Sequence, residues 1–175
     1  MKSLLRSFLR LDSTATSEAH DALRNLVDAL ERLDPDRARY LAQFAYLLGR
    51  VAHADQHVSA EETRVMEQLV ATEGDLPRDQ ALLVVALAKT SNRLFGGTDN
   101  YLVAREFADA ATYDQKLALL RCLFAVSIVE GNISIEEERE IQRISRELRI
   151  EPSDVLKLRL EHREHLPGLS DRDRE

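Results

Sequence analysis

The feature that most constrains this chain is an internal duplication. The segment Val51–Glu62 (VAHADQHVSAEE) aligns without a gap with Val126–Glu137 (VSIVEGNISIEE), 75 residues later. At the same offset Pro77 aligns with Pro152. Self-similarity at a fixed offset indicates one supersecondary unit used more than once. We therefore divide the chain into two repeats, about 37–90 and 112–165, that are joined by residues 91–111.

Composition and periodicity predict that both repeats are helical. The chain has only 6 glycines and 4 prolines in 175 residues, and it is rich in Leu, Ala, Glu and Arg, which favour helices. Apolar residues recur at helical spacing, and Asp34-Pro35 is typical of a helix start. The predicted helices cover 17–33, 35–54, 59–72, 77–90, 98–110, 112–129, 134–148 and 152–164.

These elements predict an all-α fold of about seven to nine helices. Each repeat is expected to be a helix, an acidic turn, a second helix and a third helix that begins at a proline. One hairpin cannot bury its apolar stripe alone, so we expect the two to pack face to face as one pseudo-symmetric domain over residues 17–165.

The two ends of the chain are expected to lie outside this domain. Residues 1–11 predict a short amphipathic helix that either docks on the body or contacts a membrane surface or a partner. Its apolar and basic faces contain Leu5, Phe8 and Leu9, and Lys2, Arg6 and Arg10. Residues 166–175 form a charged tail that is expected to be disordered.

Charge and hydropathy exclude several classes of function. The net charge of −7 argues against a nucleic-acid partner, because phosphate binding needs a basic face. No apolar run approaches the length of a membrane span, and no secretory signal is apparent. A lone Cys122 excludes an intramolecular disulfide, and we expect it to be a buried packing residue. The lone cysteine suits a reducing compartment, and these features give no oligomeric state.

The repeated turn follows the pattern acid-x-x-aliphatic-Ser-x-x-Glu. In both repeats the serine is a predicted helix N-cap, and the glutamate three residues later closes a capping box. The serines and glutamates are Ser59 and Glu62 in the first repeat and Ser134 and Glu137 in the second. Helix capping alone accounts for this part of the pattern.

The acid that opens each turn needs a further reason. Asp55 and Glu130 each lie at the end of an apolar stripe, where a carboxylate opposes the helix dipole at a cost of up to about 1 kcal/mol. Either the carboxylate accepts amide protons of the turn, or it binds a cation. In the second case, four carboxylates would form an oxygen-rich site for a divalent ion. These are Asp55, Glu62, Glu130 and Glu137.

Two other metal sites fit the sequence poorly. A regular EF-hand loop is excluded, because its first ligand would be Val51 in one repeat and Val126 in the other. His53, Asp55 and His57 have zinc-binding side chains, but the second repeat does not keep the two histidines, and we interpret them as solvated.

No catalytic residue is predicted. Cys122 has no histidine partner at helical spacing, and Gly96-Gly97 is not followed by the lysine of a phosphate-binding loop. We therefore expect a protein that is not an enzyme.

The doubled turn in an all-helical chain resembles the TerB tellurite-resistance family. It is also similar to the cytoplasmic helical region of DjlA-type membrane co-chaperones. The family turn is close to Ala-Asp-Gly-x-Ile-Ser-x-x-Glu. Here it stands as Ala54–Glu62 and Val129–Glu137, and the resemblance covers about residues 35–150. Gln56 replaces the usual glycine and Glu130 the usual aspartate, which changes the backbone freedom and the reach of the proposed ligands.

The resemblance implies a bacterial cytoplasmic protein that belongs to a system for resistance to tellurite or to wider stress. A location at the inner face of the membrane is also compatible with the resemblance. It implies metal sensing or scaffolding, with protein partners from that system. It also implies a third role, as a co-chaperone-like regulator, although the chain has no His-Pro-Asp signature of a J-domain.

Overall fold

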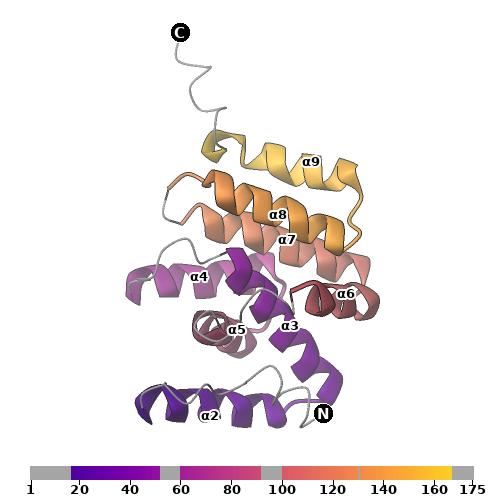
Figure 1. Cartoon of the computed structure of the whole chain (residues 1–175). Helices are drawn as coiled ribbons and strands as arrows, with labels where there is room; N and C mark the ends of the chain where they lie inside the picture. The colour runs from indigo at the N-terminus through magenta and orange to yellow at the C-terminus, as the bar shows by residue number, and fades with distance from the viewer. Residues whose placement is uncertain (1–16, 52–59, 92–99, 130, 167–175) are drawn as a thin grey trace.

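The computed structural model describes residues 17–51, 60–91, 100–129 and 131–166. Within these ranges the chain forms eight α-helices, one short 3-10 helix and no strand, which confirms the predicted all-α fold (Figure 1). The helices are α2 (Ser17–Glu31), α3 (Pro35–Val51), α4 (Ala60–Glu73), α5 (Arg78–Ser91), α6 (Asn100–Ala110), α7 (Tyr113–Ser127), α8 (Ile135–Glu147), α9 (Pro152–Glu161) and η1 (Arg163–His165).

Helix starts follow the local sequence signals. Asp34 caps α3, since its Oδ1 accepts the amide protons of Asp36 and Arg37 at 3.0 and 3.3 Å. Pro35 takes the first helical position of α3. An N–H at this position has no partner within the helix, so its absence in proline costs no hydrogen bond. Pro152 takes the same position in α9. The predicted N-terminal helix (1–11) lies outside the described residues.

The first helices of the two repeats, α3 and α7, form the centre of the core. Leu41 and Leu48 on α3, and Leu119 and Leu123 on α7, are all 0 % exposed. Burying such a side chain stabilises the fold by about 1.5–3 kcal/mol. Helix α3 contacts α5, α6, α7 and α8, and α7 contacts α4, α8 and α9. The layers of Figure 1 run from α2 at one end to α9 at the other.

The second helix of each repeat begins at the same repeat position. Helix α4 begins at Ala60 and α8 at Ile135, which are 75 residues apart. Helix α4 packs on α7 of the other repeat, and α8 packs on α3. The order of the elements thus follows the duplication, while a two-fold relation between the repeats stays a prediction.

These second helices also end in the same way. A left-handed residue follows each, Asp75 (φ 51°) after α4 and Arg149 (φ 56°) after α8. The next residue, Leu76 or Ile150, is buried, and its N–H donates to the carbonyl five residues earlier. This is the Schellman arrangement, which satisfies carbonyls left open at a helix end.

Cys122 is fully buried, as predicted, where α7 meets the end of α4. A Cβ on Gly74 would lie 2.4 Å from the Val70 carbonyl oxygen and 3.1 Å from Cys122 Sγ, so this close approach requires glycine. Burial raises the pKa of the Cys122 thiol, with a smaller contribution from Glu73. The thiol therefore stays protonated and acts as a small apolar side chain.

At the C-terminal end, the prediction that the tail begins at residue 166 is wrong by one residue, because Leu166 is 0 % exposed and belongs to the core. The rest of the predicted disordered tail, 167–175, lies outside the described residues. Across the described helices, none has the length and hydropathy needed to cross a membrane.

Candidate functional site at the acidic turns

The second acidic turn has a backbone that only glycine adopts readily. Helix α7 ends at Ser127, with Ile128 as its C-cap. Gly131 then donates its N–H to the Ile128 carbonyl at 3.0 Å, with a φ of +125°. A side chain at this φ is strained even where space is free. The glycine of the family turn therefore has a conformational reason in the second repeat; Gln56, which replaces it in the first repeat, lies outside the described residues.

The capping box predicted for the second repeat is confirmed. Ser134 Oγ accepts the Glu137 N–H at 3.1 Å, and Glu137 Oε2 accepts the Ser134 N–H at 2.8 Å. Ile133, directly before the cap, is 2 % exposed, and its N–H donates to the His165 carbonyl at 2.8 Å. The start of α8 is thus fixed by its own cap and by η1. The first-repeat cap residue, Ser59, lies outside the described residues.

The capping bond leaves Glu137 with coordination capacity. Its side chain is half-buried in the first turn of α8, and the capping box uses Oε2. A carboxylate has about four lone-pair positions on two oxygens. One carboxylate can therefore cap the helix and still offer its other oxygen to a cation, so the two explanations of the turn are compatible.

The structure describes two of the four predicted metal ligands. Glu62 is half-buried in the first turn of α4, and Glu137 holds the equivalent place in α8. Asp55 and Glu130 lie outside the described residues, so the convergence of all four carboxylates stays a prediction. Within the part of the chain that is described, no group of three or more His, Cys, Asp or Glu side chains is arranged to hold a metal.

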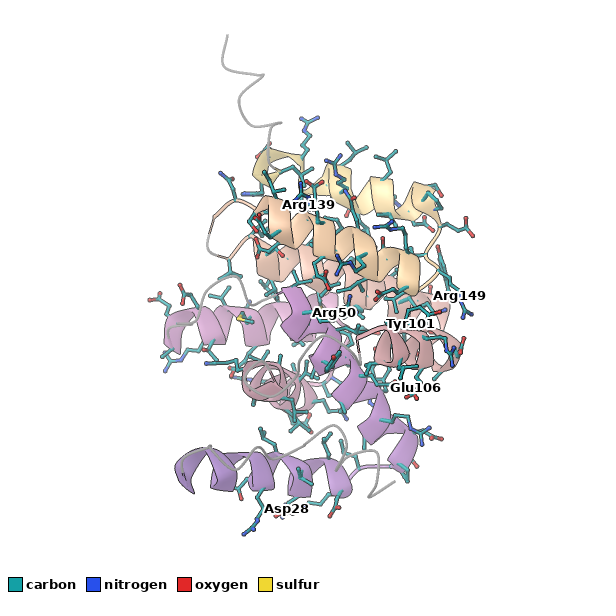
Figure 2. The ribbon with its side chains drawn as sticks, viewed as in Figure 1. Asp28, Arg50, Tyr101, Glu106, Arg139 and Arg149 are labelled. Carbon is teal, nitrogen blue, oxygen red and sulfur yellow. The ribbon has the colours of Figure 1, made fainter. Side chains whose placement is uncertain are left out.

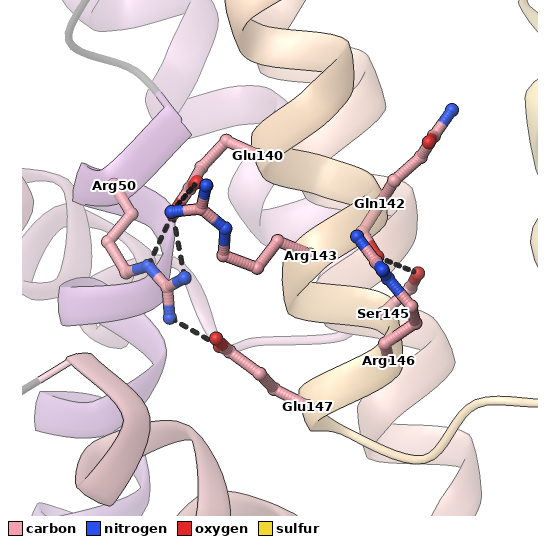
Figure 3. A network of polar contacts seen from close by, with 7 residues as sticks. All are labelled: Arg50, Glu140, Gln142, Arg143, Ser145, Arg146 and Glu147. Atoms are coloured by element: carbon pink, nitrogen blue, oxygen red, sulfur yellow. Dashed lines mark hydrogen bonds and ion pairs between the residues drawn. The ribbon is translucent and has the colours of Figure 1, made fainter.

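One helical turn beyond Glu137, a buried ion-pair cluster joins the two repeats (Figure 3). Arg50 projects from the last turn of α3 toward α8 (Figure 2). Its Nε donates to Glu140 Oε1 at 2.8 Å, and its Nη1 donates to Glu147 Oε2 at 2.7 Å. Its Nη2 lies 2.7 Å from Glu140 Oε1, and Arg143 approaches the other oxygen of Glu140 at 3.2 Å.

The electrostatics of this cluster favour the charged form of Arg50. Burial opposes the charge of Arg50, whose side chain is 6 % exposed, but the hydrogen bonds to Glu147 and Glu140 outweigh it and raise the pKa of Arg50. The planar guanidinium reaches both glutamates with separate N–H groups, a geometry that an ammonium cannot reproduce. Arg50 is therefore a fixed cation between α3 and α8, and it orients one repeat against the other.

Sequence reasoning did not find this cluster. The available signal was a charged residue, Arg50, inside the otherwise apolar run Leu47–Val51. At the offset of 75, the equivalents of the three residues are Ala125, Val65 and Thr72. The repeat pattern therefore gave no indication of it, because the cluster exists in one of the two copies.

The predicted membrane or partner contact, which includes Lys2, Leu5, Arg6, Phe8, Leu9 and Arg10, lies wholly outside the described residues.

The fold and the second turn together define a class of protein: within the described residues it is an all-helical module with a capped turn before α8 and an ion-pair cluster around the buried Arg50 side chain. The particular family follows from comparison with known families. Residues 41–160, which are 120 of the 175 residues, match the model of the family described as Tellurite resistance protein TerB. The chain belongs to this family. Parallel comparisons with curated proteins and with solved structures gave no match.

Proposed function

We propose that this protein is a divalent-cation-dependent module of a tellurite- or stress-resistance system. The carboxylates of Asp55, Glu62, Glu130 and Glu137 would hold the ion. The protein would act by binding partner proteins of that system, without catalysis and without nucleic acid. Its place would be the bacterial cytoplasm, including the inner face of the membrane.

The observation that carries the proposal is the geometry of the second turn. Glu137 is held in place by the capping bond through Oε2, which leaves its other oxygen for an ion. Hard cations such as Ca²⁺ and Mg²⁺ prefer such preorganised carboxylate oxygens. Membership of the TerB family supports the link to tellurite resistance.

A consequence for neighbouring helices follows from the ion-pair cluster. Glu140 lies three residues after Glu137 on the same helix, and it is bonded to Arg50 on α3. A change in the position of the first turn of α8 would therefore alter the contact between the repeats. In the proposal, ion binding sets the angle between the repeats and hence the surface that a partner meets.

The test is thermal unfolding in chelator and then with millimolar Ca²⁺, Mg²⁺, Mn²⁺ or Zn²⁺. An ion that binds only the folded state raises the free energy of unfolding by mass action, by about 2.7 kcal/mol at a hundred times its Kd, and the midpoint rises with it. We expect Glu137→Gln to abolish the rise while it keeps the midpoint in chelator. The reason is that glutamine also closes a capping box, as Gln115 does with Thr112 in α7.

The matched control is Glu136→Gln, which removes the same charge from the same helical turn at an exposed position. We expect this variant to keep the rise. No rise with any ion in the wild-type chain would contradict the proposal, as would an equal loss of the rise in both variants.

A metal-free scaffold is the second candidate, and a specific surface favours it. Leu156 and Leu160 lie one turn apart on α9 and are 53 % and 51 % exposed. Apolar side chains that are exposed next to each other provide surface that a partner can cover. In this proposal the turns are capped helix ends, and the anchor is residues 1–11. Deletion of residues 1–11 should then abolish binding to anionic vesicles, and unchanged binding would exclude this segment as the anchor.

A co-chaperone-like role would require a separate J-domain protein.

A further inference from the structure

A hollow of about 440 Å³ lies between α3, α6 and the start of α7, apart from the acidic turns. Its volume is in the range of small-molecule sites in proteins, which is about 300–1,000 Å³. Two consecutive small residues at the end of α6, Ala110 and Ala111, line one side. Tyr40 from α3 lines the other, with its ring stacked on Phe107 at a centroid distance of 5.4 Å.

The lining carries a positive balance in an acidic protein. Arg37 and Arg39 contribute two cations and Asp36 contributes one anion, whereas the whole chain has a net charge of −7. Asp36 is 90 % exposed at its side chain and lies 3.6 Å from Arg39 Nη1. At this exposure the ion pair contributes little, so Arg39 can turn to another anion without much loss.

Arg37 is the best-positioned group in the hollow. Its Nε and Nη2 both donate to Gln80 Oε1 on α5, at 2.8 and 2.5 Å, and its guanidinium lies 5.1 Å above the centroid of the Tyr40 ring. These contacts fix the side chain and leave Nη1 without a hydrogen bond to any described residue. A preorganised guanidinium donor is well suited to a carboxylate or a phosphate.

A buried amide lies on the same face of α3. Gln43 is 2 % exposed and lines the hollow, although its neighbours on α3 are apolar core residues. Its Nε2 donates to Glu106 Oε2 at 3.2 Å, a bond that links α3 to α6 (Figure 2 labels Glu106 on α6). Among the described residues, no hydrogen bond is made to its Oε1. An amide oxygen at this depth is available to a donor on a bound molecule.

We propose that this hollow binds a small organic oxyanion. Its carboxylate or phosphate group would lie against Arg37 and Arg39, and its apolar part against Tyr40 and Ala110–Ala111. An inorganic anion alone would leave most of the volume and the apolar wall unused. The ligand class is therefore a charged head on an apolar body, and the site is independent of the acidic turns.

The experiment is a titration of the full-length protein at constant ionic strength, by calorimetry and by amide chemical shifts. The probes are benzoate and phenyl phosphate, with inorganic phosphate as the head alone and benzyl alcohol as the body alone. We expect benzoate or phenyl phosphate to bind at least about tenfold more tightly than inorganic phosphate or benzyl alcohol. The reason is that inorganic phosphate lacks the apolar contacts and benzyl alcohol lacks the charged ones. Shifts should concentrate in α3, α6 and the start of α7. Preference between the two aryl anions identifies the head group.

Two variants locate the site. Arg37→Gln should weaken binding about tenfold or more, because a charge-assisted hydrogen bond is lost. Arg139→Gln removes the same charge from an exposed position of α8 and should bind as the wild type does. Ala110→Leu fills the hollow from an exposed position, so it should block binding while the protein stays folded. Absence of saturable binding by both aryl anions, or an equal loss in Arg139→Gln, would overturn the proposal.

Discussion

At the scale of single residues, backbone conformation separates positions that look alike in the sequence. Gly131 takes a φ of +125°, whereas Asp75 and Arg149 take left-handed conformations without being glycine. A left-handed non-glycine residue costs roughly 1 kcal/mol, and the buried contacts of Leu76 and Ile150 offset it. The glycine of the turn was predictable from the resemblance to the family turn, but not from the repeat, because Gln56 stands at this position in the first copy. The two left-handed helix ends were not predictable, because neither residue carries the usual glycine signal.

His162 provides a prediction at this scale. Its ring stacks on Phe124 at a centroid distance of 5.6 Å, and burial lowers the pKa of His162, with Glu161 and His165 acting in opposite directions. Because the folded-state pKa is depressed, the unfolded chain binds the proton more tightly. Stability is therefore full above the unfolded pKa of about 6.5 and falls as the pH drops toward the folded value.

We expect His162→Phe, which keeps an aromatic ring but cannot titrate, to lose less stability than the wild type between about pH 7.5 and 5.5. Urea unfolding at a series of pH values measures this difference. His165→Gln is a partial control. It keeps the backbone carbonyl that binds Ile133 and removes only the smaller effect of His165 on the pKa of His162, so most of the pH dependence should remain. Parallel pH curves for the wild type and His162→Phe would contradict the assignment.

At the scale of helices, local signals set where each element begins, and tertiary contacts decide how elements pair. The start of α3 at Pro35 and the cap of α8 at Ser134 follow from a few neighbouring residues, so the sequence predicted them. The partners of Arg50 lie 90 and 97 residues away. They become its neighbours because α3 packs on α8, and no periodicity in the sequence specifies that pairing. The hollow beside Arg37 was missed for the same reason, since three helices form it.

The Arg50 cluster gives a prediction at the scale of helix pairing. Breaking a buried ion pair by removing one partner costs about 3–5 kcal/mol, because the remaining charge stays buried. Glu140 and Glu147 keep 18 % and 15 % exposure, so we expect Arg50→Met to lower the free energy of unfolding by about 2–3 kcal/mol.

Equilibrium unfolding in urea measures this loss. Arg143→Met removes an arginine that contacts the same Glu140 but is 61 % exposed, and it should cost less than about 1 kcal/mol. The triple change Arg50→Met, Glu140→Gln and Glu147→Gln should recover part of the stability, since no charge then stays unpaired. A loss in Arg50→Met no larger than in Arg143→Met would show that the cluster does not join the repeats.

At the scale of the whole molecule, the packing of α4 on α7 and of α8 on α3 interleaves the two repeats. Each repeat buries its apolar stripe with the help of the other, so we expect the TerB domain to unfold as one cooperative unit. The candidate turn lies at the edge of this unit, where η1 and the start of α8 meet. The hollow beside Arg37 lies elsewhere, and residues of α3, α6 and α7 line it. A cation effect and an anion effect can therefore be measured separately in one protein.

The placement of Arg50 also determines which halves recognise each other. Consider two molecules whose first repeats pair with each other, so that α4 of one takes the place of α8 against α3 of the other. Arg50 would then face Val65 and Thr72, which are the counterparts of Glu140 and Glu147 in the first repeat. A guanidinium buried there would have no carboxylate to balance it, and such a complex would be disfavoured by several kcal/mol, of the order found for an uncompensated buried charge. Duplication produced two similar halves, and this one charge makes them unlike enough that a first half pairs with a second half and not with its own kind.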